Sequence, residues 1–251
     1  MGLDPTFLLL AIGVTIFAGA VKGAVGFAMP MIMISGLASF MPADQALVAL
    51  ILPTFLTNIV QALRQGGKAA WNSTVGFWRM IAALVIFVLL TAQAVPFIPQ
   101  AVLLGALGVP IAAFAIVQPA GRKIRFDARN RGLAEVLTGI VGGIYGGVSG
   151  VWGPPTIALL VSLDTEKQES VRVQGVVYSI GSVALLAGHA GSGVITTDRL
   201  MLSAVLIAPA LAGLWFGFAI QDRLDAQRFR RWTLVILAVT GLNLIRRAFF
   251  I

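Results

Sequence analysis

The chain has 251 residues, of which 58% are hydrophobic and 11% charged, and it contains no cysteine. A soluble domain carries about a quarter charged residues, so this composition excludes an ordinary soluble protein, and the lack of cysteine excludes disulfide frameworks and thiolate metal sites. The net charge of +8 predicts basic loops that orient a membrane protein, not a nucleic-acid interface.

Long apolar windows predict membrane-spanning helices along the whole chain. Each window is near the roughly 20 residues that cross a bilayer, and all are too uniformly apolar for barrel strands. The predicted fold is therefore an all-α polytopic membrane protein. We expect hydrophobic segments near residues 5–26, 28–40, 43–63, 74–95, 100–118, 132–150, 153–163, 168–188, 197–219 and 229–250. The second and seventh are short, which predicts broken or re-entrant helices.

The longest polar stretch, residues 118–132, divides the chain nearly in half. Placing Gly19 over Gly146 aligns "GAVKGAVG" with "GGVSGVWG", and four of the eight positions match. An odd number of segments in each half predicts two inverted repeats. The predicted domains are a first transmembrane repeat (1–118), a basic cytoplasmic linker (119–131) and a second transmembrane repeat (132–251).

Basic residues predict the orientation of the chain. The positive-inside rule places the central linker in the cytoplasm, together with Arg64, Lys68, Lys167 and Arg172, and the N-terminus outside. Arg246 and Arg247 fall on the opposite side, against the rule. We expect a multi-pass protein of the cell membrane, in a bacterium the inner membrane.

Glycine and proline interrupt two apolar stretches, "GAVKGAVGFAMP" (19–30) and "YGGVSGVWGPP" (145–155). A break exposed to lipid would leave backbone groups unpaired at a cost of several kcal/mol each. Paired breaks in the two halves of a chain instead indicate a transporter's binding site. Helices that begin after such breaks offer N–H groups and a positive dipole end to an anion. The alternative is that the glycines only allow close packing, which we favour for Gly213 and Gly217.

Polar residues near the breaks are candidates for contact with an anion. Lys22 is charged within an apolar segment and either faces the break or extends to the cytoplasmic interface; its counterpart is Ser149, a neutral donor. Trp152 and the polar pairs of the third and eighth segments either line a cavity or join helices. The predicted substrate-binding residues are Lys22, Gly23, Gly26, Met29, Pro30, Asn58, Gln61, Ser149, Gly150, Trp152, Gly153, Pro154, Pro155, Gln174 and Tyr178.

Other ionisable residues are expected to lie at the membrane surface. His189 falls in a predicted outer turn, and Glu135 falls near the cytoplasmic start of a segment. We expect no metal and no cofactor. The expected partners are a small anionic substrate and the lipid bilayer, without nucleic acid, and a homodimer is left open.

The two interrupted stretches resemble the TauE/SafE family of sulfite exporters, and the layout extends this resemblance over nearly the whole chain. The positions that match are Gly19, Gly23, Gly26, Pro30, Gly146, Gly147, Gly150, Gly153 and Pro155. Lys22 is not part of the family's motif. The resemblance implies a secondary transporter of sulfite, organosulfonates or other small sulfur-containing anions.

The sequence thus predicts a transporter that exports a small sulfur-containing anion, such as sulfite, sulfoacetate or a product of taurine, by alternating access. We do not expect an enzyme. A passive anion channel is the main alternative. A membrane-embedded serine hydrolase of the GxSG type is a weaker one, because Ser149 would need His189 as its base.

Overall fold

The computed structural model describes residues 5–117, 130–192, 196–221 and 226–249, which form helices and no strands. The elements are α1 (Pro5–Val25), α2 (Met29–Leu37), α3 (Ala43–Leu63), α4 (Gly67–Gly76), α5 (Trp78–Ala92), the short 3-10 helix η1 (Val95–Phe97), α6 (Gln100–Val117), α7 (Arg131–Ser149), α8 (Gly153–Ser162), α9 (Lys167–Ser192), α10 (Thr197–Val205), α11 (Ile207–Gln221) and α12 (Ala226–Phe249). The all-α fold is confirmed, and short helices follow both predicted breaks.

Several helices are long and apolar enough to cross a membrane. Within the described residues five segments meet this criterion: Pro5–Ala24, Ala43–Leu63, Arg131–Ser149, Gln168–His189 and Thr197–Ile220. The pair α4 and α5 meets it jointly but bends by 78° at Phe77. The fold is that of a polytopic membrane protein.

The sequence predicts one segment over 74–95, but the structure has two helices there, α4 and α5, which meet at a bend. The chain is already helical from Gly67, and α4 carries Lys68, Asn72 and Ser73. These polar residues lower the hydropathy of α4, so a search for apolar windows begins after most of it. A second interruption, at Leu206, divides the segment predicted over 197–219 into α10 and α11.

The chain divides into two compact units. Unit 1 comprises residues 1–53, 95–121 and 194–251, and unit 2 comprises residues 54–94 and 122–193. Each unit therefore contains segments from both predicted repeats, and α3 begins in one unit and ends in the other. Most of the predicted linker, residues 119–129, lies outside the described part of the chain.

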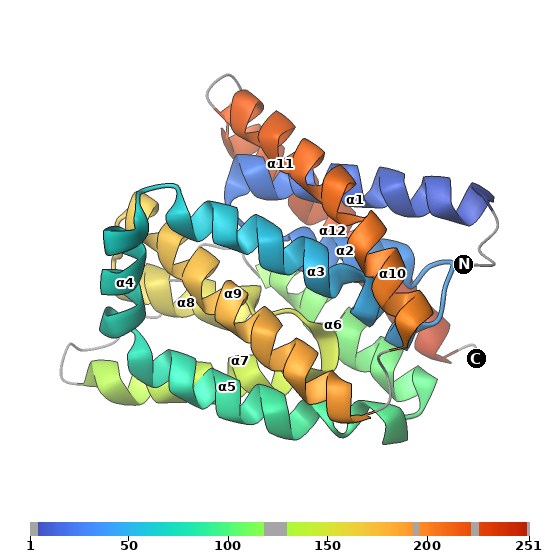
Figure 1. Ribbon diagram of the computed structural model, residues 1–251, viewed down its shortest axis with the longest axis horizontal. Coiled ribbons are helices and arrows are strands. Elements are labelled where there is room, and N and C mark those ends of the chain that lie inside the picture. The colour runs from blue at the N-terminus through green and yellow to red at the C-terminus, as the bar shows by residue number, and fades with distance from the viewer. Residues whose placement is uncertain (1–4, 118–129, 193–195, 222–225, 250–251) are drawn as a thin grey trace. The chain divides into compact units, whose positions relative to one another are not determined.

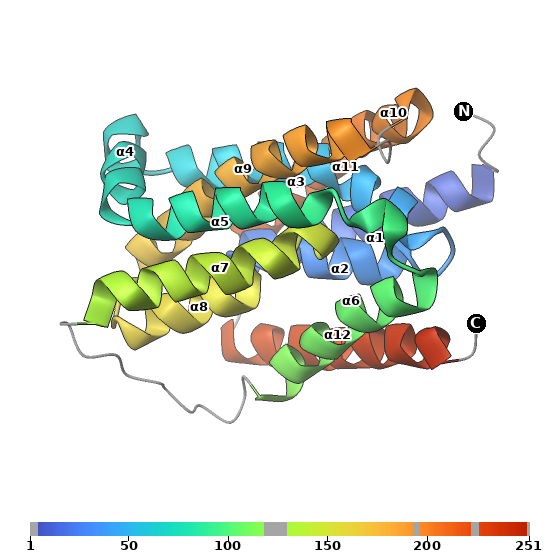
Figure 2. The ribbon, with the colours of Figure 1, turned by 90° about the horizontal axis from the view of Figure 1, so that it is seen from below.

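In unit 1, glycines bring α1 and α11 into close contact (Figure 1). A Cβ atom on Gly19 or Gly23 would overlap the backbone of α11, and one on Gly213 or Gly217 would overlap the backbone of α1. The packing role expected for Gly213 and Gly217 is confirmed. The helices α6 and α12 also pack together (Figure 2), and Gly108 there faces the backbone of Gly241.

A serine of α10 completes the hydrogen bonding of α3 at Pro53, which lies inside that helix. Proline has no N–H, so the carbonyl oxygen of Ala49 lacks its usual helical donor. The hydroxyl of Ser203 donates to this oxygen at 3.1 Å and accepts from the N–H of Leu52, also at 3.1 Å. The buried Ser203 therefore joins α10 to α3 within unit 1.

In unit 2, α5 packs along α7 and α9 (Figure 2). Gly139, Gly143 and Gly147 lie on the face of α7 toward α5, where a Cβ atom would meet the backbone or side chains of α5. The short helix α8 packs on α7 and α9. The contact between α7 and α5 thus resembles the contact between α1 and α11, because in both cases glycines of an interrupted stretch allow the two helices to approach closely.

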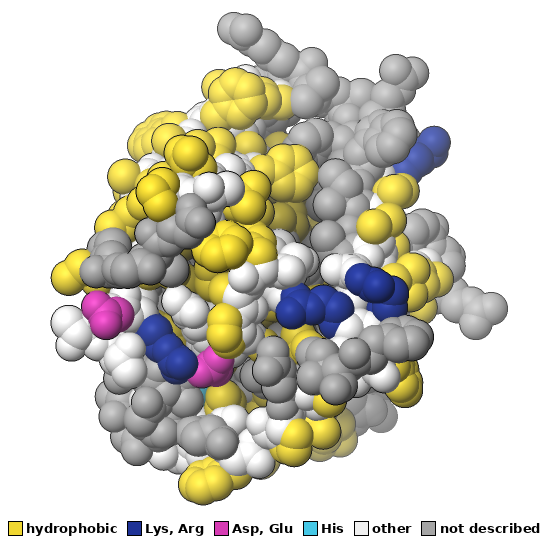
Figure 3. All heavy atoms as spheres, turned by 90° about the vertical axis from the view of Figure 1, so that its right-hand side faces the viewer, with side chains coloured by type: hydrophobic (Ala, Val, Ile, Leu, Met, Phe, Trp, Pro, Cys, Tyr) yellow, Lys and Arg dark blue, Asp and Glu magenta, His cyan; other side chains and the backbone are white. Residues whose placement is uncertain are grey.

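Large apolar side chains are exposed over much of the described surface, as suits contact with lipid. On the face drawn in Figure 3, hydrophobic side chains surround a few basic and acidic ones. One ion pair at the starts of α3 and α10 joins Asp44 and Arg199 at 2.7 Å.

Replacing Gly19 with alanine should destabilise the protein because the new Cβ atom would overlap the carbonyl oxygen of Ala210. The expected cost is about 1–3 kcal/mol, typical of overpacking. Gly13→Ala is the matched control on the same helix, since nothing lies within 4 Å of its Cβ position. Thermal unfolding in detergent should show a lower midpoint for Gly19→Ala alone, and equal midpoints would contradict the close contact.

A double-mutant cycle tests the hydrogen bonds at Pro53. Ser203→Ala should cost about 1–3 kcal/mol because it leaves buried backbone groups unpaired. In a Pro53→Ala background the new N–H can donate to Ala49, so the same change should cost less. Unfolding of the four proteins should give a coupling energy of at least about 0.5 kcal/mol, and additive effects would show that Ser203 does not substitute for the missing N–H.

Candidate functional site

The first break separates α1 from α2 in unit 1. Gly26 has φ +84° and donates its N–H to the carbonyl oxygen of Lys22 at 2.7 Å, which ends α1. Ala28, with φ +79°, then precedes α2 in a left-handed conformation that costs a non-glycine residue about 1–2 kcal/mol. The chain thus turns sharply, and the buried Met29 and Pro30 begin α2.

Lys22 lies in the last turn of α1, and its side chain is buried, with a relative exposure of 1%. This burial is inconsistent with the alternative in which the ammonium group extends to the membrane interface. Since α1 places Lys22 only four positions before Gly26, it is an ionisable side chain close in sequence to the break.

Gly23 is one predicted binding residue that the structure assigns to packing. A Cβ atom on Gly23 would overlap the carbonyl oxygen of Leu214 and lie 2.8 Å from the Cα atom of Gly217. The surface of Gly23 is therefore covered by α11, which gives it a packing role, and its contact with substrate stays a prediction. The sequence pattern could not separate the two roles, because glycines of both kinds occur in one stretch.

The second break separates α7 from α8 in unit 2. Gly150 has φ +68° and ends α7, and α8 begins at Gly153 with Pro154 and Pro155 in its first turn, as predicted. The buried Thr156 donates its hydroxyl to the carbonyl oxygen of Trp152 at 2.8 Å. This bond stabilises the start of α8, and the sequence analysis did not select Thr156.

The hydroxyl of Ser149 is used within the break itself. It donates to the carbonyl oxygen of Tyr145 at 2.7 Å and accepts from the N–H of Val151 at 3.2 Å. A hydroxyl has one proton, so Ser149 is not a ready donor for an anion in this structure. Its observed role is to pair backbone groups where the helix ends.

Trp152 lies in a slot between two glycines. A Cβ atom on Gly146 of α7 would overlap its indole nitrogen, and one on Gly181 of α9 would lie 3.0 Å from its Cε2 atom. The ring of Tyr178 stacks against the indole, with 6.0 Å between the ring centroids. Trp152 is fully buried in unit 2, and its Nε1 atom has no hydrogen-bond partner among the described residues.

The predicted polar residues of α3 and α9 also come together in unit 2. A Cβ atom on Gly175 would lie 2.6 Å from the backbone nitrogen of Ala62 and 3.1 Å from the carbonyl oxygen of Asn58, so α9 crosses α3 closely here. The amide of Gln61 donates to the carbonyl oxygen of Val171 at 2.8 Å. This bond joins the helices, as one of the two interpretations of Gln61 expected.

We call the buried set Asn58, Gln61, Trp152, Gln174 and Tyr178 the polar cluster. The Oε1 atom of Gln174 and the hydroxyl of Tyr178 have no well-formed hydrogen bond within the described residues, although the latter lies close to the hydroxyl of Thr156. Unpaired buried polar groups are costly and require a reason. Such a cluster in a membrane chain is a candidate ligand site.

His189 is not in a surface turn, contrary to the prediction. It lies within α9, its side chain has a relative exposure of 0%, and its ring is hydrogen-bonded to the backbone of Gly147. The hydropathy of residues 188–192 is low, which hid the last turn of α9. Since the proton of Ser149 is shared with the carbonyl oxygen of Tyr145, the geometry gives no support to a serine nucleophile activated by His189.

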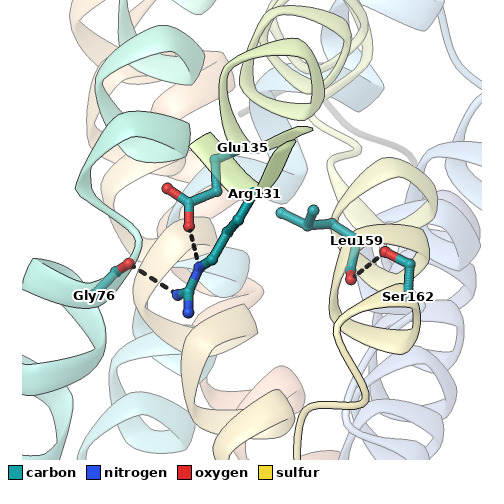
Figure 4. A network of polar contacts seen from close by, with 5 residues as sticks. All are labelled: Gly76, Arg131, Glu135, Leu159 and Ser162. Carbon is teal, nitrogen blue, oxygen red and sulfur yellow. Dashed lines mark hydrogen bonds and ion pairs between the residues drawn. The ribbon is translucent and has the colours of Figure 1, made fainter. Parts of the chain in front are cut away.

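Glu135 lies near the start of α7, as predicted, but it is buried and ion-paired with Arg131 at 2.8 Å (Figure 4). In the described part of the chain, no group of three or more His, Cys, Asp or Glu side chains could bind a metal ion.

Replacing Ser149 with alanine should lower the free energy of unfolding by about 1–3 kcal/mol, because the buried N–H of Val151 would lose its acceptor. Ser182→Ala is the control, since Ser182 is also buried and donates to a carbonyl oxygen four residues earlier, that of Tyr178. Thermal unfolding should show the larger loss for Ser149→Ala. A smaller loss than in the control would argue against its role in the break.

Comparisons with known proteins identify the family of the chain. Searches of curated proteins and of solved structures each returned no match. The family model described as "Sulfite exporter TauE/SafE" matches residues 11–244, which include both breaks and the polar cluster. The chain belongs to the TauE/SafE family of sulfite exporters.

Proposed function

We propose that this protein moves a small sulfur-containing anion, sulfite or an organosulfonate, across the cell membrane, and that the polar cluster of unit 2 binds it. The observation that carries this proposal is the indole N–H of Trp152. It is a buried donor beside a broken helix, and it has no partner among the described residues. An anion with several acceptor oxygens supplies such a partner.

The chemistry of the polar cluster suits a sulfonate or hydrogensulfite group. These groups present acceptor oxygens, and indole, phenol and primary amides all offer N–H or O–H donors. Rotation of the Gln174 side-chain amide can present either its oxygen or its NH₂ group. The cluster contains no carboxylate that would repel an anion, and the aromatic pair Trp152 and Tyr178 gives it an apolar wall for an organic substituent.

Lys22 of unit 1 is an alternative candidate for binding the anion, separate from the polar cluster. Its side chain is buried four positions before Gly26, and the buried Met29 and Pro30 begin α2 after the break. An ionisable residue within a membrane segment is a functional candidate by default. In unit 2 the corresponding proposed contacts are Gly150, Gly153, Pro154 and Pro155, which shape the backbone at the start of α8.

We propose secondary transport by alternating access of two inverted repeats, in the direction of export. Support comes from the order of the helices: a long helix, a short one, a long one, a bent or interrupted pair and a long one occur twice, in α1–α6 and in α7–α12. The contact of α1 with α11 also has its equivalent in that of α7 with α5.

Contacts inside each unit support the proposed orientation. Arg131 donates to the carbonyl oxygen of Gly76, and Arg172 donates to Ser73. We propose that all four residues lie near the cytoplasmic side, as the positive-inside rule favours. Asp44 pairs with Arg199 at ends proposed to lie outside. We propose the inner membrane of a bacterium as the location, and we keep a homodimer as a proposal to be tested by the mass of the purified protein.

Trp152→Phe should weaken binding of the transported anion about tenfold or more, because a hydrogen bond to a charged group contributes about 1.5–3 kcal/mol. Thermal unfolding with sulfite, sulfoacetate, taurine, sulfate and an aromatic sulfonate measures this loss. A ligand at 100 times its dissociation constant adds about 2.7 kcal/mol of stability. Trp215→Phe is the matched control, since Trp215 is exposed on α11 in unit 1.

If the ligand stabilises Trp152→Phe as much as it stabilises the wild type, the polar cluster is not the binding site. If the ligand also fails to stabilise Lys22→Gln, the binding site is assigned to unit 1. Counterflow of labelled sulfite in proteoliposomes then tests the mechanism. A carrier accelerates exchange when unlabelled substrate is present on the other side, whereas a passive channel does not.

A further inference from the structure

We propose that the corner between α4 and α5 binds the headgroups of anionic phospholipids at the membrane surface. We define the α4–α5 corner by Lys68, Trp71, Trp78, Arg79 and Arg131. The inference depends on the membrane fold of the chain and not on the substrate, so it can be tested separately from transport.

The bend at Phe77 gives α4 a direction suited to the surface of a bilayer. Helix α5 is apolar between Arg79 near its start and Thr91 near its end, and α4 turns away from it by 78° (Figure 1). A helix nearly perpendicular to a spanning helix lies along the membrane plane. Its inner face packs on α9, where Ser73 accepts a hydrogen bond from Arg172 at 2.8 Å.

The outer face of α4 has the composition of an interfacial helix. Lys68, Trp71, Asn72 and Val75 are exposed and recur at helical spacing along one side. Trp71 and Trp78 have relative exposures of 67% and 57%. Tryptophan is enriched at the level of lipid headgroups, so these two rings, with Lys68, fit that layer.

Two guanidinium groups lie where the corner meets the start of α7. The guanidinium carbon of Arg79 is 5.4 Å from the centroid of the Trp78 ring, and its Nη1 atom is 3.4 Å from the Cβ position of Gly132. Arg131 lies 5.1 Å from the Phe77 ring centroid and donates to the carbonyl oxygen of Gly76 (Figure 4). The aromatic rings therefore orient both cations at one place.

The charge of the corner favours a phosphate-bearing partner. Glu135 is buried against Arg131, the neighbouring α8–α9 connection carries Asp164 and Glu166, and Glu169 lies in the first turn of α9. Lys68 and Arg79 remain exposed. Arginine binds phosphate through two parallel hydrogen bonds, and basic residues beside a span are attracted to anionic leaflets.

A second copy of the chain is a less suitable occupant of this surface. A twofold interface places the same patch of both subunits face to face, so the two sets of basic residues would meet. Lysine is also depleted from protein interfaces. We therefore assign the exposed tryptophans to lipid.

The test titrates the full-length protein in a neutral detergent with phosphatidylglycerol or phosphatidylcholine and follows thermal unfolding. Phosphatidylglycerol should stabilise the wild type at lower concentration than phosphatidylcholine. Each basic residue near an anionic surface contributes about fivefold to binding, so Lys68→Gln/Arg79→Gln should shift the phosphatidylglycerol titration at least about tenfold. The matched control, Arg231→Gln/Arg246→Gln, removes two exposed charges from α12 and should leave the titration unchanged.

Three outcomes would overturn the proposal. The first is equal stabilisation by both lipids, and the second is an equal loss in the α12 control, which would indicate general charge attraction. The third is a change from dimer to monomer in Trp71→Ala/Trp78→Ala with an unchanged lipid titration, which would assign the surface to a second copy. The charge-preserving variant Lys68→Arg/Arg79→Lys should retain lipid binding and controls for misfolding.

Discussion

The pairing of backbone N–H and C=O groups in a medium without water is the constraint on which this structure depends. Each interruption of a helix has its own local solution. At the first break the N–H of Gly26 donates to the carbonyl oxygen of Lys22. At the second break the hydroxyl of Ser149 donates to the carbonyl oxygen of Tyr145 and accepts from the N–H of Val151. At Pro53 the hydroxyl of Ser203 replaces the missing N–H donor. Turn hydrogen bonds and serine hydroxyls therefore pair backbone groups that the interruptions leave without a helical partner.

Glycine has two separate tasks in the interrupted stretches. At Gly26 and Gly150 the backbone has positive φ and changes direction. At Gly19, Gly23, Gly143 and Gly147 the missing side chain lets α1 approach α11 and lets α7 approach α5. Close helix contacts of this kind stabilise association in lipid, where the hydrophobic effect between helices is absent. The same short stretch thus supplies both the close helix contact and the turn of the backbone.

Most of the fold could be predicted from the sequence because apolar length and glycine–proline breaks are local signals. The positions of α2 and α8 follow from such signals. What the sequence did not show depends on contacts beyond the local pattern. Nothing local shows that Leu214 covers Gly23, that the proton of Ser149 is already shared, or that His189 continues α9. The bend at Phe77 was not predicted, because α4 is too polar to be found by a search for apolar windows.

The slot around Trp152 has an evolutionary consequence. Gly146, Gly181 and Trp152 together fill one volume, and none of the three can enlarge while the others stay unchanged. The surroundings of this indole, where we propose that the anion binds, therefore cannot be reshaped by single substitutions at these glycines. A residue larger than glycine at position 146 or 181 fits only after a smaller residue has replaced Trp152. That first replacement leaves a cavity until the second one fills it. Diversification of specificity in this part of the chain should proceed through coupled changes in sequence rather than independent ones.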